Sequence, residues 1–189
     1  MLPAADEYKI TDYECVEFAA LAHSCSAATQ CEVMHREMQT LFALLDRQWD
    51  AKYSKYAMTQ ITDSHGHVLR QDVDTSFAIL LKSSPWLPTC VMCISTANNT
   101  FTVTQSREIK IGMDLFVRVP AISHLLGDHV PYLEATPAPK SSFPQFLGIQ
   151  NSIKVEFVVG LLKGWCERTS GGGPRPFNTS MEHIKAIYR

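Results

Sequence analysis

One amphipathic stripe constrains the fold of this chain more than any other feature of its sequence. Five large apolar side chains recur at steps of four, three, four and four residues: Met34, Met38, Leu41, Leu45 and Trp49. An α-helix turns once in about 3.6 residues, so this spacing places all five on one face. The opposite face is polar and carries Arg36, Glu37, Gln39, Arg47 and Asp50. The pattern predicts a helix over residues 30–56 that packs its apolar face on a core.

Capping signals predict further helices. Thr11 and Glu14 form a capping box, in which a hydroxyl and a carboxylate satisfy free backbone N–H groups, ahead of a helix over 12–25. Residues 74–76 cap a short helix that starts near Phe77, and a proline-containing segment ends it. A later helix is expected to start at residue 151 or 152. It has four large apolar side chains at four-residue spacing: Ile153, Phe157, Leu161 and Trp165.

Two β-hairpins are predicted from β-prone runs that flank turn-forming residues. Residues 58–62 and 67–70 flank the sequence Asp-Ser-His-Gly, and residues 91–95 and 101–105 flank the sequence Ala-Asn-Asn-Thr. Residues 106–150 are rich in proline and glycine, with apolar islands between them, which indicates a packed loop region with short helical turns. Together the elements predict an α+β fold that is mainly helical, with short β-hairpins and this long packed loop region.

The length of 189 residues, of which 46% are hydrophobic, is enough for one domain with its own core. We expect a mixed α+β domain over residues 10–168, with a helical part at 10–57 and a mixed part at 58–168. Three consecutive glycines and a proline predict a linker at 169–177. Residues 178–189 read as the start of a helix that stops after just over two turns. We therefore expect the chain to be part of something longer.

Charge and composition argue against several classes of protein. With 17 Lys and Arg against 19 Asp and Glu, the net charge is −2, and the basic excess of a nucleic-acid-binding protein is absent. No run of about 18 uncharged apolar residues predicts a membrane span. The first residues show neither the basic region nor the apolar run of a signal peptide. We expect an intracellular protein, cytoplasmic or nuclear, with reduced cysteines and with no nucleic-acid or membrane partner.

Two groups of cysteine and histidine residues are the candidates for metal or thiol chemistry. Cys90 and Cys93 form a CxxC pair, which can be a redox dithiol or half of a zinc site. Side chains three residues apart in a strand point to opposite faces, so we favour structural cysteines. The second group is His23, Cys25, Cys31 and His35. Its spacing is irregular for a zinc finger, so we expect no metal and no cofactor and keep both groups as alternatives.

Catalytic motifs are absent from the sequence. It contains no Gly-x-Ser-x-Gly elbow, no phosphate-binding Walker loop, no dinucleotide fingerprint and no HExxH zinc motif. His65 and His67 flank a glycine and fit an exposed turn. His124 and His129 have no matching nucleophile beside them. We therefore expect that the chain is not an enzyme and does not bind or hydrolyse ATP.

Several motifs occur in an order that resembles a known family. The most specific are Ser-Ser-x-Trp-Leu-Pro at 83–88 and Leu-Gly-Asp-x-x-Pro-Tyr at 126–132. Asp-Leu-Phe at 114–116, Phe-Leu-Gly-Ile at 146–149 and Leu-Leu-Lys-Gly-Trp at 161–165 accompany them. This order resembles the region downstream of the ATPase in NO VEIN-type proteins, over about residues 57–189. Those proteins are very large, with an HSP90-like ATPase domain of the histidine-kinase type nearer the N-terminus, and are similar in layout to sacsin.

The resemblance implies a non-catalytic scaffold or interaction segment of a large NO VEIN-like ATPase-containing protein. The family's nucleotide site needs an Asn-bearing helix and an Asp-x-Gly-x-Gly loop, of which residues 63–66 are only a superficial echo. The motif residues are then packing residues: Trp86, Leu87, Pro88, Leu126, Gly127, Asp128, Pro131, Tyr132, Leu147, Gly148 and Trp165. The implied partners are the rest of a larger polypeptide and another protein. The alternatives are a zinc- or thiol-dependent module and a stand-alone adaptor that binds a partner helix.

Overall fold

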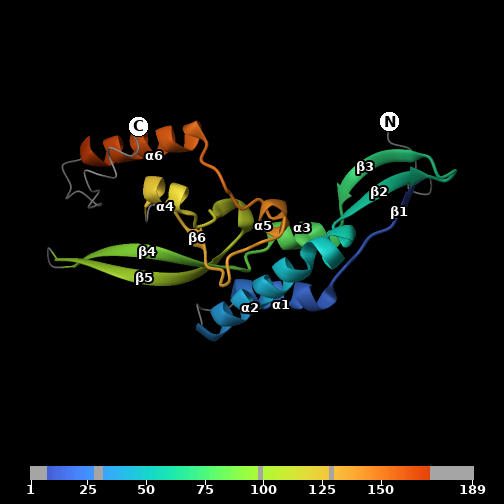
Figure 1. Cartoon of the computed structure of the whole chain (residues 1–189), viewed down its shortest axis with the longest axis horizontal. Coiled ribbons are helices and arrows are strands. Elements are labelled where there is room, and N and C mark those ends of the chain that lie inside the picture. Colours follow the sequence, from blue (N-terminus) through green and yellow to red (C-terminus); the bar gives the residue numbers. More distant parts are fainter. Residues whose placement is uncertain (1–7, 28–31, 98–99, 128–129, 171–189) are drawn as a thin grey trace.

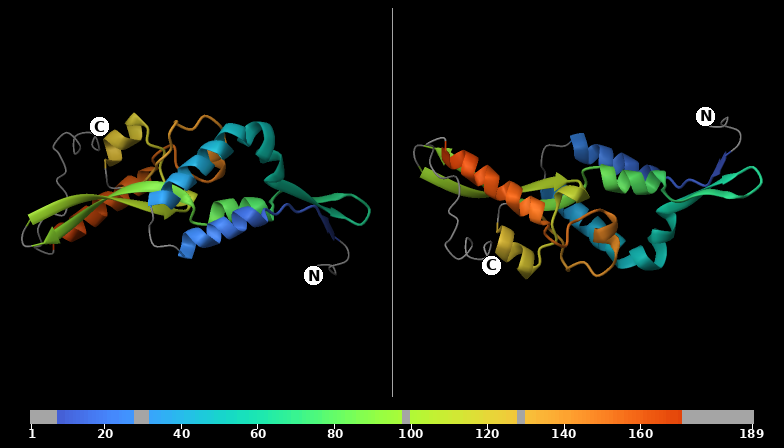
Figure 2. Two further views of the ribbon diagram at one scale, coloured as in Figure 1. Left: turned by 90° about the horizontal axis from the view of Figure 1, so that it is seen from below. Right: turned by 90° about the horizontal axis from the view of Figure 1, so that it is seen from above.

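The computed structural model describes residues 8–27, 32–97, 100–127 and 130–170, and for 26–27, 91–97, 100–106, 161 and 164–170 it describes the backbone alone. Helices α1 (Val16–Ala27), α2 (Glu32–Gln48) and α3 (Ser76–Ser83) form the middle of an elongated molecule. A small sheet projects from one end and a long hairpin from the other, as Figure 1 and both views of Figure 2 show.

The projecting sheet has three antiparallel strands in the order β1-β2-β3. They are β1 (Tyr8–Ile10), β2 (Met58–Asp63) and β3 (Val68–Asp74). The β2–β3 hairpin was predicted, and its turn contains Gly66 at a φ of 86°, a conformation that suits glycine. Strand β1 was not predicted. Its three residues pair with the end of β2, where Ile10 lies opposite Ile61.

The second sheet has the order β5-β4-β6, again antiparallel. Strands β4 (Leu87–Ala97) and β5 (Thr100–Lys110) form the long hairpin, and β6 (Tyr132–Leu133) pairs with β4 only at Thr89 and Cys90. The predicted second hairpin is confirmed, and it is longer than expected, because regular pairing continues to Lys110.

A 3₁₀ turn at Gly112–Asp114 and three helices follow this hairpin. The helices are α4 (Pro120–Leu126), α5 (Phe143–Phe146) and the longer α6 (Val155–Ser170). Phe116 forms bridges with Tyr132 and Gln150, so three separate stretches of the chain are held side by side. Figure 1 shows α6 running along the side of the molecule from which the β4–β5 hairpin projects.

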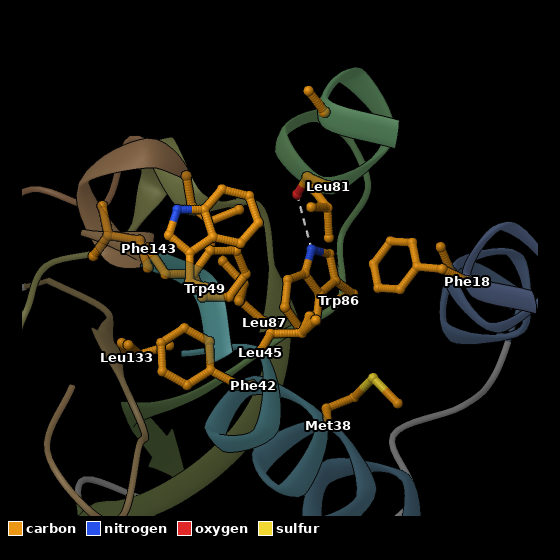
Figure 3. Packing of buried hydrophobic residues seen from close by; sticks show 14 of the residues in the cluster. Phe18, Met38, Phe42, Leu45, Trp49, Leu81, Trp86, Leu87, Leu133 and Phe143 are labelled. Atoms are coloured by element: carbon orange, nitrogen blue, oxygen red, sulfur yellow. Dashed lines mark hydrogen bonds between the residues drawn. The ribbon is translucent and has the colours of Figure 1, made fainter. Parts of the chain in front are cut away.

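The main hydrophobic core lies where α1, α2, α3 and the start of β4 meet. Trp86 is fully buried at its centre, and its indole Nε1–H donates a hydrogen bond to the Leu81 carbonyl over 2.8 Å (Figure 3). Phe18 of α1 meets the indole edge-on with ring centroids 5.2 Å apart, and Phe42 of α2 lies 6.4 Å away. Three members of the predicted stripe are buried in this core, Met38, Leu45 and Trp49, and the other two, Met34 and Leu41, are partly buried against it. Phe42, which was not part of the predicted stripe, is buried beside them. We call Met38, Phe42, Leu45 and Trp49 the inner stripe.

A second, smaller apolar cluster lies under α4. Its buried members are Phe116, Ile122, Leu126, Val130 and Tyr132. Ile153 and Phe157 pack against it, and the rings of Phe116 and Phe157 lie 5.2 Å apart. This cluster anchors the first turn of α6. The side chains of Leu161 and Trp165, expected on the same stripe, lie outside the described residues.

The α+β fold class is confirmed, but the start of the first helix was predicted incorrectly. The capping box at 11–14 does not begin a helix, and α1 starts at Val16. Instead, Asp12 accepts hydrogen bonds from the Ser76 backbone N–H and hydroxyl, and the Tyr13 carbonyl accepts one from Phe77 N–H. Contacts with the start of α3 therefore hold this segment extended and override the local capping signal.

Three other boundaries need correction. The helix expected to start at residue 151 or 152 is α6, which starts at Val155, because Gln150 is held extended by hydrogen bonds to Leu115 and Val117. The part predicted as helical at 10–57 does not begin with a helix. Its first residue, Ile10, lies in strand β1, because pairing with β2 satisfies its backbone. The linker predicted at 169–177 begins too early, since α6 continues to Ser170, just before the first glycine. Residues 171–189, with the rest of the linker and the predicted last helix, lie outside the described residues.

The helix predicted over 30–56 is helical over 32–56, but in three forms. The α-helix ends at Gln48, a π-helical turn covers Trp49–Tyr53, and a 3₁₀ turn covers Ser54–Tyr56. In the π turn the Ser54 N–H bonds the Trp49 carbonyl, five residues back. In the part of the chain that the structure covers, no helix is both long and apolar enough to cross a membrane.

Candidate interaction groove on α2

Helix α2 carries apolar side chains on its outer face as well as on its inner face. At about 100° per residue, Val33, Thr40 and Leu44 fall within about 40° of one another and roughly opposite the buried Phe42. Val33 is 63% exposed and Leu44 is 48% exposed. Single exposed apolar residues are normal on protein surfaces, but these two lie on one line along the helix. We call Val33, Thr40 and Leu44 the outer stripe of α2.

The outer stripe borders a hollow between α2 and the segment at residues 137–141. The hollow encloses about 720 Å³. Its helical wall contains Thr40, Phe42, Ala43, Leu44, Asp46, Arg47, Asp50 and Ala51, and its other wall contains Pro137, Ala138, Lys140 and Ser141. A shallower depression along the stripe, lined also by Arg36, Glu37 and Leu41, shares Thr40 and Leu44 with it. The stripe and both hollows form one continuous surface, which we call the α2 groove.

The far wall of the α2 groove is fixed by hydrogen bonds to two carboxylates, Asp46 of α2 and Asp50 of the π-helical turn that follows it. Asp46 accepts from the backbone N–H groups of Lys140 and Ser141 over 3.1 and 3.3 Å, and from the Ser141 hydroxyl over 2.6 Å. Asp50 accepts from the backbone N–H and the hydroxyl of Ser142. Hydrogen bonds to ionised acceptors are among the stronger ones in proteins, so this wall is attached to the helix.

Three cations remain on the groove: Arg36, Arg47 and Lys140. Among the described residues, none of the three forms an ion pair. Both arginines lie on the side of the outer stripe that faces residues 137–141, since they are eleven residues apart and differ by about 20° around the helix. Asp46 and Asp50 lie on that side as well and accept hydrogen bonds from the wall. Glu37 lies on the other side of the stripe. The described lining of the groove thus carries three basic and three acidic side chains, and its charges balance.

A buried histidine links α2 to the β4 sheet on the inner side. His35 Nε2 lies 3.3 Å from the Thr89 carbonyl oxygen and 3.5 Å from Glu134 Oε2. His35 is buried, and Glu134 Oε2 is a buried oxygen that makes no hydrogen bond within the described structure. This contact joins the first half of α2 to β4 and to the residue after β6. It lies away from the α2 groove and contains no nucleophile, so we assign it a structural role.

The predicted metal and thiol candidates that the structure describes do not converge on one site. Cys25 is buried with its Sγ 3.6 Å from the Met38 sulfur, and burial, with a smaller effect from Glu37, raises the pKa of its thiol. A raised pKa disfavours the reactive thiolate. His23 is exposed on α1, whereas His35 is buried on α2. Over the described ranges, no three His, Cys, Asp or Glu side chains converge on a metal position.

Two of the cysteine candidates cannot be placed. Cys31 lies outside the described residues, and so does the side chain of Cys93. Cys90 is half-buried in β4, where it pairs with Arg107 of β5 and Tyr132 of β6. The backbone of Cys93 is also in β4, as the strand interpretation of the CxxC pair requires.

Five of the eleven motif residues that the family resemblance implied for packing lie in the two apolar clusters. Trp86, Leu87 and Leu147 lie in the main core, and Leu126 and Tyr132 lie in the second cluster. Pro88 is buried at the start of β4, and Pro131 is half-buried beside Tyr132. Gly127 ends α4 and Gly148 follows α5, both with positive φ. Asp128 and the side chain of Trp165 lie outside the described residues.

The described lining of the α2 groove combines apolar side chains with charged ones. Its described lining contains no histidine and no cysteine, and both carboxylates of its hollow are engaged by the wall. Sequence reasoning missed this site, because the far face of α2 was interpreted from its charged residues alone. The available signal was a pair of apolar residues, Val33 and Leu44, on that polar face.

Comparisons with known proteins give no further guide to the site. A scan against protein-family models, a search of curated proteins and a search of solved structures each found no match.

Proposed function

We propose that this chain is a non-catalytic interaction module, which holds a partner protein on the α2 groove. One observation carries the proposal: α2 buries one apolar stripe in the core and leaves a second on a hollowed outer surface. Exposed apolar surface beside polar side chains is typical of protein interaction sites. The proposal agrees with the role that the NO VEIN resemblance implies, a scaffold or interaction segment of a large ATPase-containing protein.

The groove is also suitably rigid for binding. Its helical wall is held by the four inner-stripe residues in the core, and its second wall is bonded to Asp46 and Asp50. A partner therefore meets a surface that is already ordered, and preorganisation lowers the entropic cost of association. The zinc- or thiol-dependent alternative has no comparable support, since the described candidates are dispersed and Cys25 is buried against Met38.

Site-specific photo-cross-linking tests the proposal. A photoreactive residue placed at Thr40, within the groove, is expected to yield a discrete adduct in cells that express the parent protein. The same residue at Gln60, exposed on β2, is the matched control and is expected to yield none. The captured protein, once purified, should bind the wild-type chain and lose binding to Leu44→Asp. Equal adducts at both positions, or equal binding to Leu44→Asp, would contradict the proposal.

A further inference from the structure

We propose that the outer edge of β5 is a dimer interface, where the β5 strands of two copies of this chain pair antiparallel around a two-fold axis at Val103. The inference goes beyond the function proposed above and concerns a surface separate from the α2 groove. Three features carry it: the open edge of β5, the uncharged sequence of that edge, and the position of the hairpin at one end of the molecule.

The outer edge of β5 presents backbone groups for pairing. No described strand pairs with this edge, because β5 is an outermost strand of its sheet. The Glu134 N–H donates to the Pro88 carbonyl, so Pro88 bonds away from β5. Its opposite residue, Ile109, therefore also directs its N–H and C=O groups away from β4, and this alternates along an antiparallel strand. The other residues of β5 with outward backbone groups are Phe101, Val103, Gln105 and Arg107.

The open edge of β5 contrasts with the edges of the other sheet. The register of β2 and β3 shifts twice, and Asp72 of β3 has a φ of 55°. Strand β3 also carries Arg70 and Asp74. Bulges and charges on an edge strand prevent unwanted pairing. The β4–β5 pairing has no shift, and residues 91–97 and 100–106 contain no charged residue and no proline. The edge of β5 is therefore open to a further strand.

The sequence of this edge favours a second copy as the partner. Val103 is the middle residue of the uncharged stretch 100–106. Antiparallel pairing centred there places Val103 opposite itself and Thr102 opposite Thr104 of the second copy. Threonine pairs across neighbouring strands stabilise a sheet, whereas like charges directly opposite each other destabilise it. Two identical uncharged strands meet without that repulsion. The register also places residues with outward backbone groups opposite one another, so ladder hydrogen bonds can form.

The position of the hairpin leaves room for a second copy. Figure 1 and both views of Figure 2 show the hairpin projecting from one end of an elongated molecule. Antiparallel pairing places the two bodies at opposite ends of the joined sheet. Lys110, at the base of the hairpin, is seven residues from Val103, so the two bases lie about 46 Å apart at about 3.3 Å per residue. The other edge of the hairpin is partly occupied, because β6 pairs with β4.

Pairing also stabilises the hairpin. Over residues 91–97 and 100–106 the described sheet has two strands, because β6 pairs with β4 only at Thr89 and Cys90. A two-stranded hairpin by itself is marginally stable in water. A second copy turns this part into a four-stranded sheet in the order β4-β5-β5-β4. The pairing is closed by its two-fold symmetry, since each β5 has one outer edge.

Charge variants at Val103 test the two-fold axis. Analytical ultracentrifugation of the wild-type chain is expected to show the mass rising with concentration from 21.2 kDa to twice that value. Val103→Lys and Val103→Glu each place like charges opposite each other, so each should weaken dimerisation at least about tenfold. An equimolar mixture of the two variants should restore the dimer, because lysine then lies opposite glutamate. Mixing does not rescue variants that have simply unfolded.

A control and a second measurement make the test specific. The control is the same pair of substitutions at Leu69, 54% exposed on the outermost strand β3 of the other sheet, which should leave dimerisation unchanged. Amide hydrogen exchange needs no variant. The N–H groups of Phe101, Val103 and Gln105 should become protected as the wild-type chain is concentrated. The N–H group of Thr102, which is directed toward β4, should be protected to the same extent throughout.

Three results would overturn the proposal. The first is a wild-type chain that stays at 21.2 kDa at every concentration. The second is a dimer that neither Val103 variant weakens, which places the interface elsewhere. The third is exchange at Phe101, Val103 and Gln105 that does not depend on concentration, and this measurement decides alone if both variants unfold. Leu44→Asp, which should lose the partner of the α2 groove, is expected to dimerise as the wild type does, so the two proposals stand or fall separately.

Discussion

Replacing Trp86 by phenylalanine tests the account of the core most sharply. The indole is 0% exposed, and its Nε1–H is the donor to the Leu81 carbonyl at the end of α3. It also contacts Phe18 edge-on and Phe42 at a tilt, so it joins three helices (Figure 3). Phenylalanine keeps an aromatic ring but has no donor. The substitution therefore removes the hydrogen bond and leaves most of the apolar contact.

The magnitude follows from these contacts. A buried carbonyl left without a donor costs about 1–3 kcal/mol. The smaller ring also weakens the edge-on contact with Phe18, a kind of pair worth about 0.5–1.5 kcal/mol. We expect Trp86→Phe to lower the free energy of unfolding by about 2–4 kcal/mol. Trp86→Ala should cost about 3–5 kcal/mol, a large part of a total of about 5–15 kcal/mol.

Urea denaturation followed by far-ultraviolet circular dichroism measures the loss. The control is Ile79→Ala, a truncation on the same helix α3 at a side chain that is 53% exposed. A surface change of this kind should alter the free energy of unfolding by less than about 0.5 kcal/mol. If Trp86→Phe also falls within that range, the indole is not the central contact of the core.

Three further substitutions have expected outcomes. Hydrogen bonds from Ser76 hold the pKa of Asp12 below its usual 3.8, so this carboxylate stabilises the fold above pH 3.8 and loses that effect as pH falls through its lowered pKa. The stability difference between wild type and Asp12→Asn should therefore shrink as denaturation is measured from pH 6 down to about pH 3. A Cβ added at Gly160 of α6 would meet open space, and alanine is the better helix former. Gly160→Ala should therefore raise the free energy of unfolding by about 1 kcal/mol and, with it, the melting temperature. Gly112→Ala should lower it, because a Cβ there would lie 2.2 Å from the Leu147 carbonyl oxygen; no decrease would contradict that packing.

The sequence predicted those elements whose signals are local. The inner stripe of α2 needs only a 3.6-residue period, and the β2–β3 hairpin needs only a turn between β-prone runs, so both were found. The start of α1 was predicted incorrectly because Asp12 accepts a hydrogen bond from Ser76, 64 residues away, and no local pattern indicates that contact. Strand β1 was missed for the same reason, since its three residues form a strand only by pairing with β2.

The candidate site was harder to predict than the fold. The groove needs a second wall, and residues 137–141 reach α2 through hydrogen bonds to Asp46 and Asp50 across more than ninety positions of sequence. Nothing near Lys140 in the sequence indicates this contact. Cysteine and histidine spacing drew attention to Cys25 and His35 instead. The fold buries both of them, in separate contacts with Met38 and with Thr89 and Glu134.

Mapping backbone amide shifts by nuclear magnetic resonance tests the central claim most directly. The isotope-labelled chain is titrated with the purified partner that is captured by cross-linking at Thr40, and the shift of each amide is followed to saturation. The account predicts that the largest changes lie along residues 33–47 of α2 and at Lys140 and Ser141, the two walls of the groove. Changes confined to the β1–β2–β3 sheet or to α6, with α2 unmoved, would contradict it.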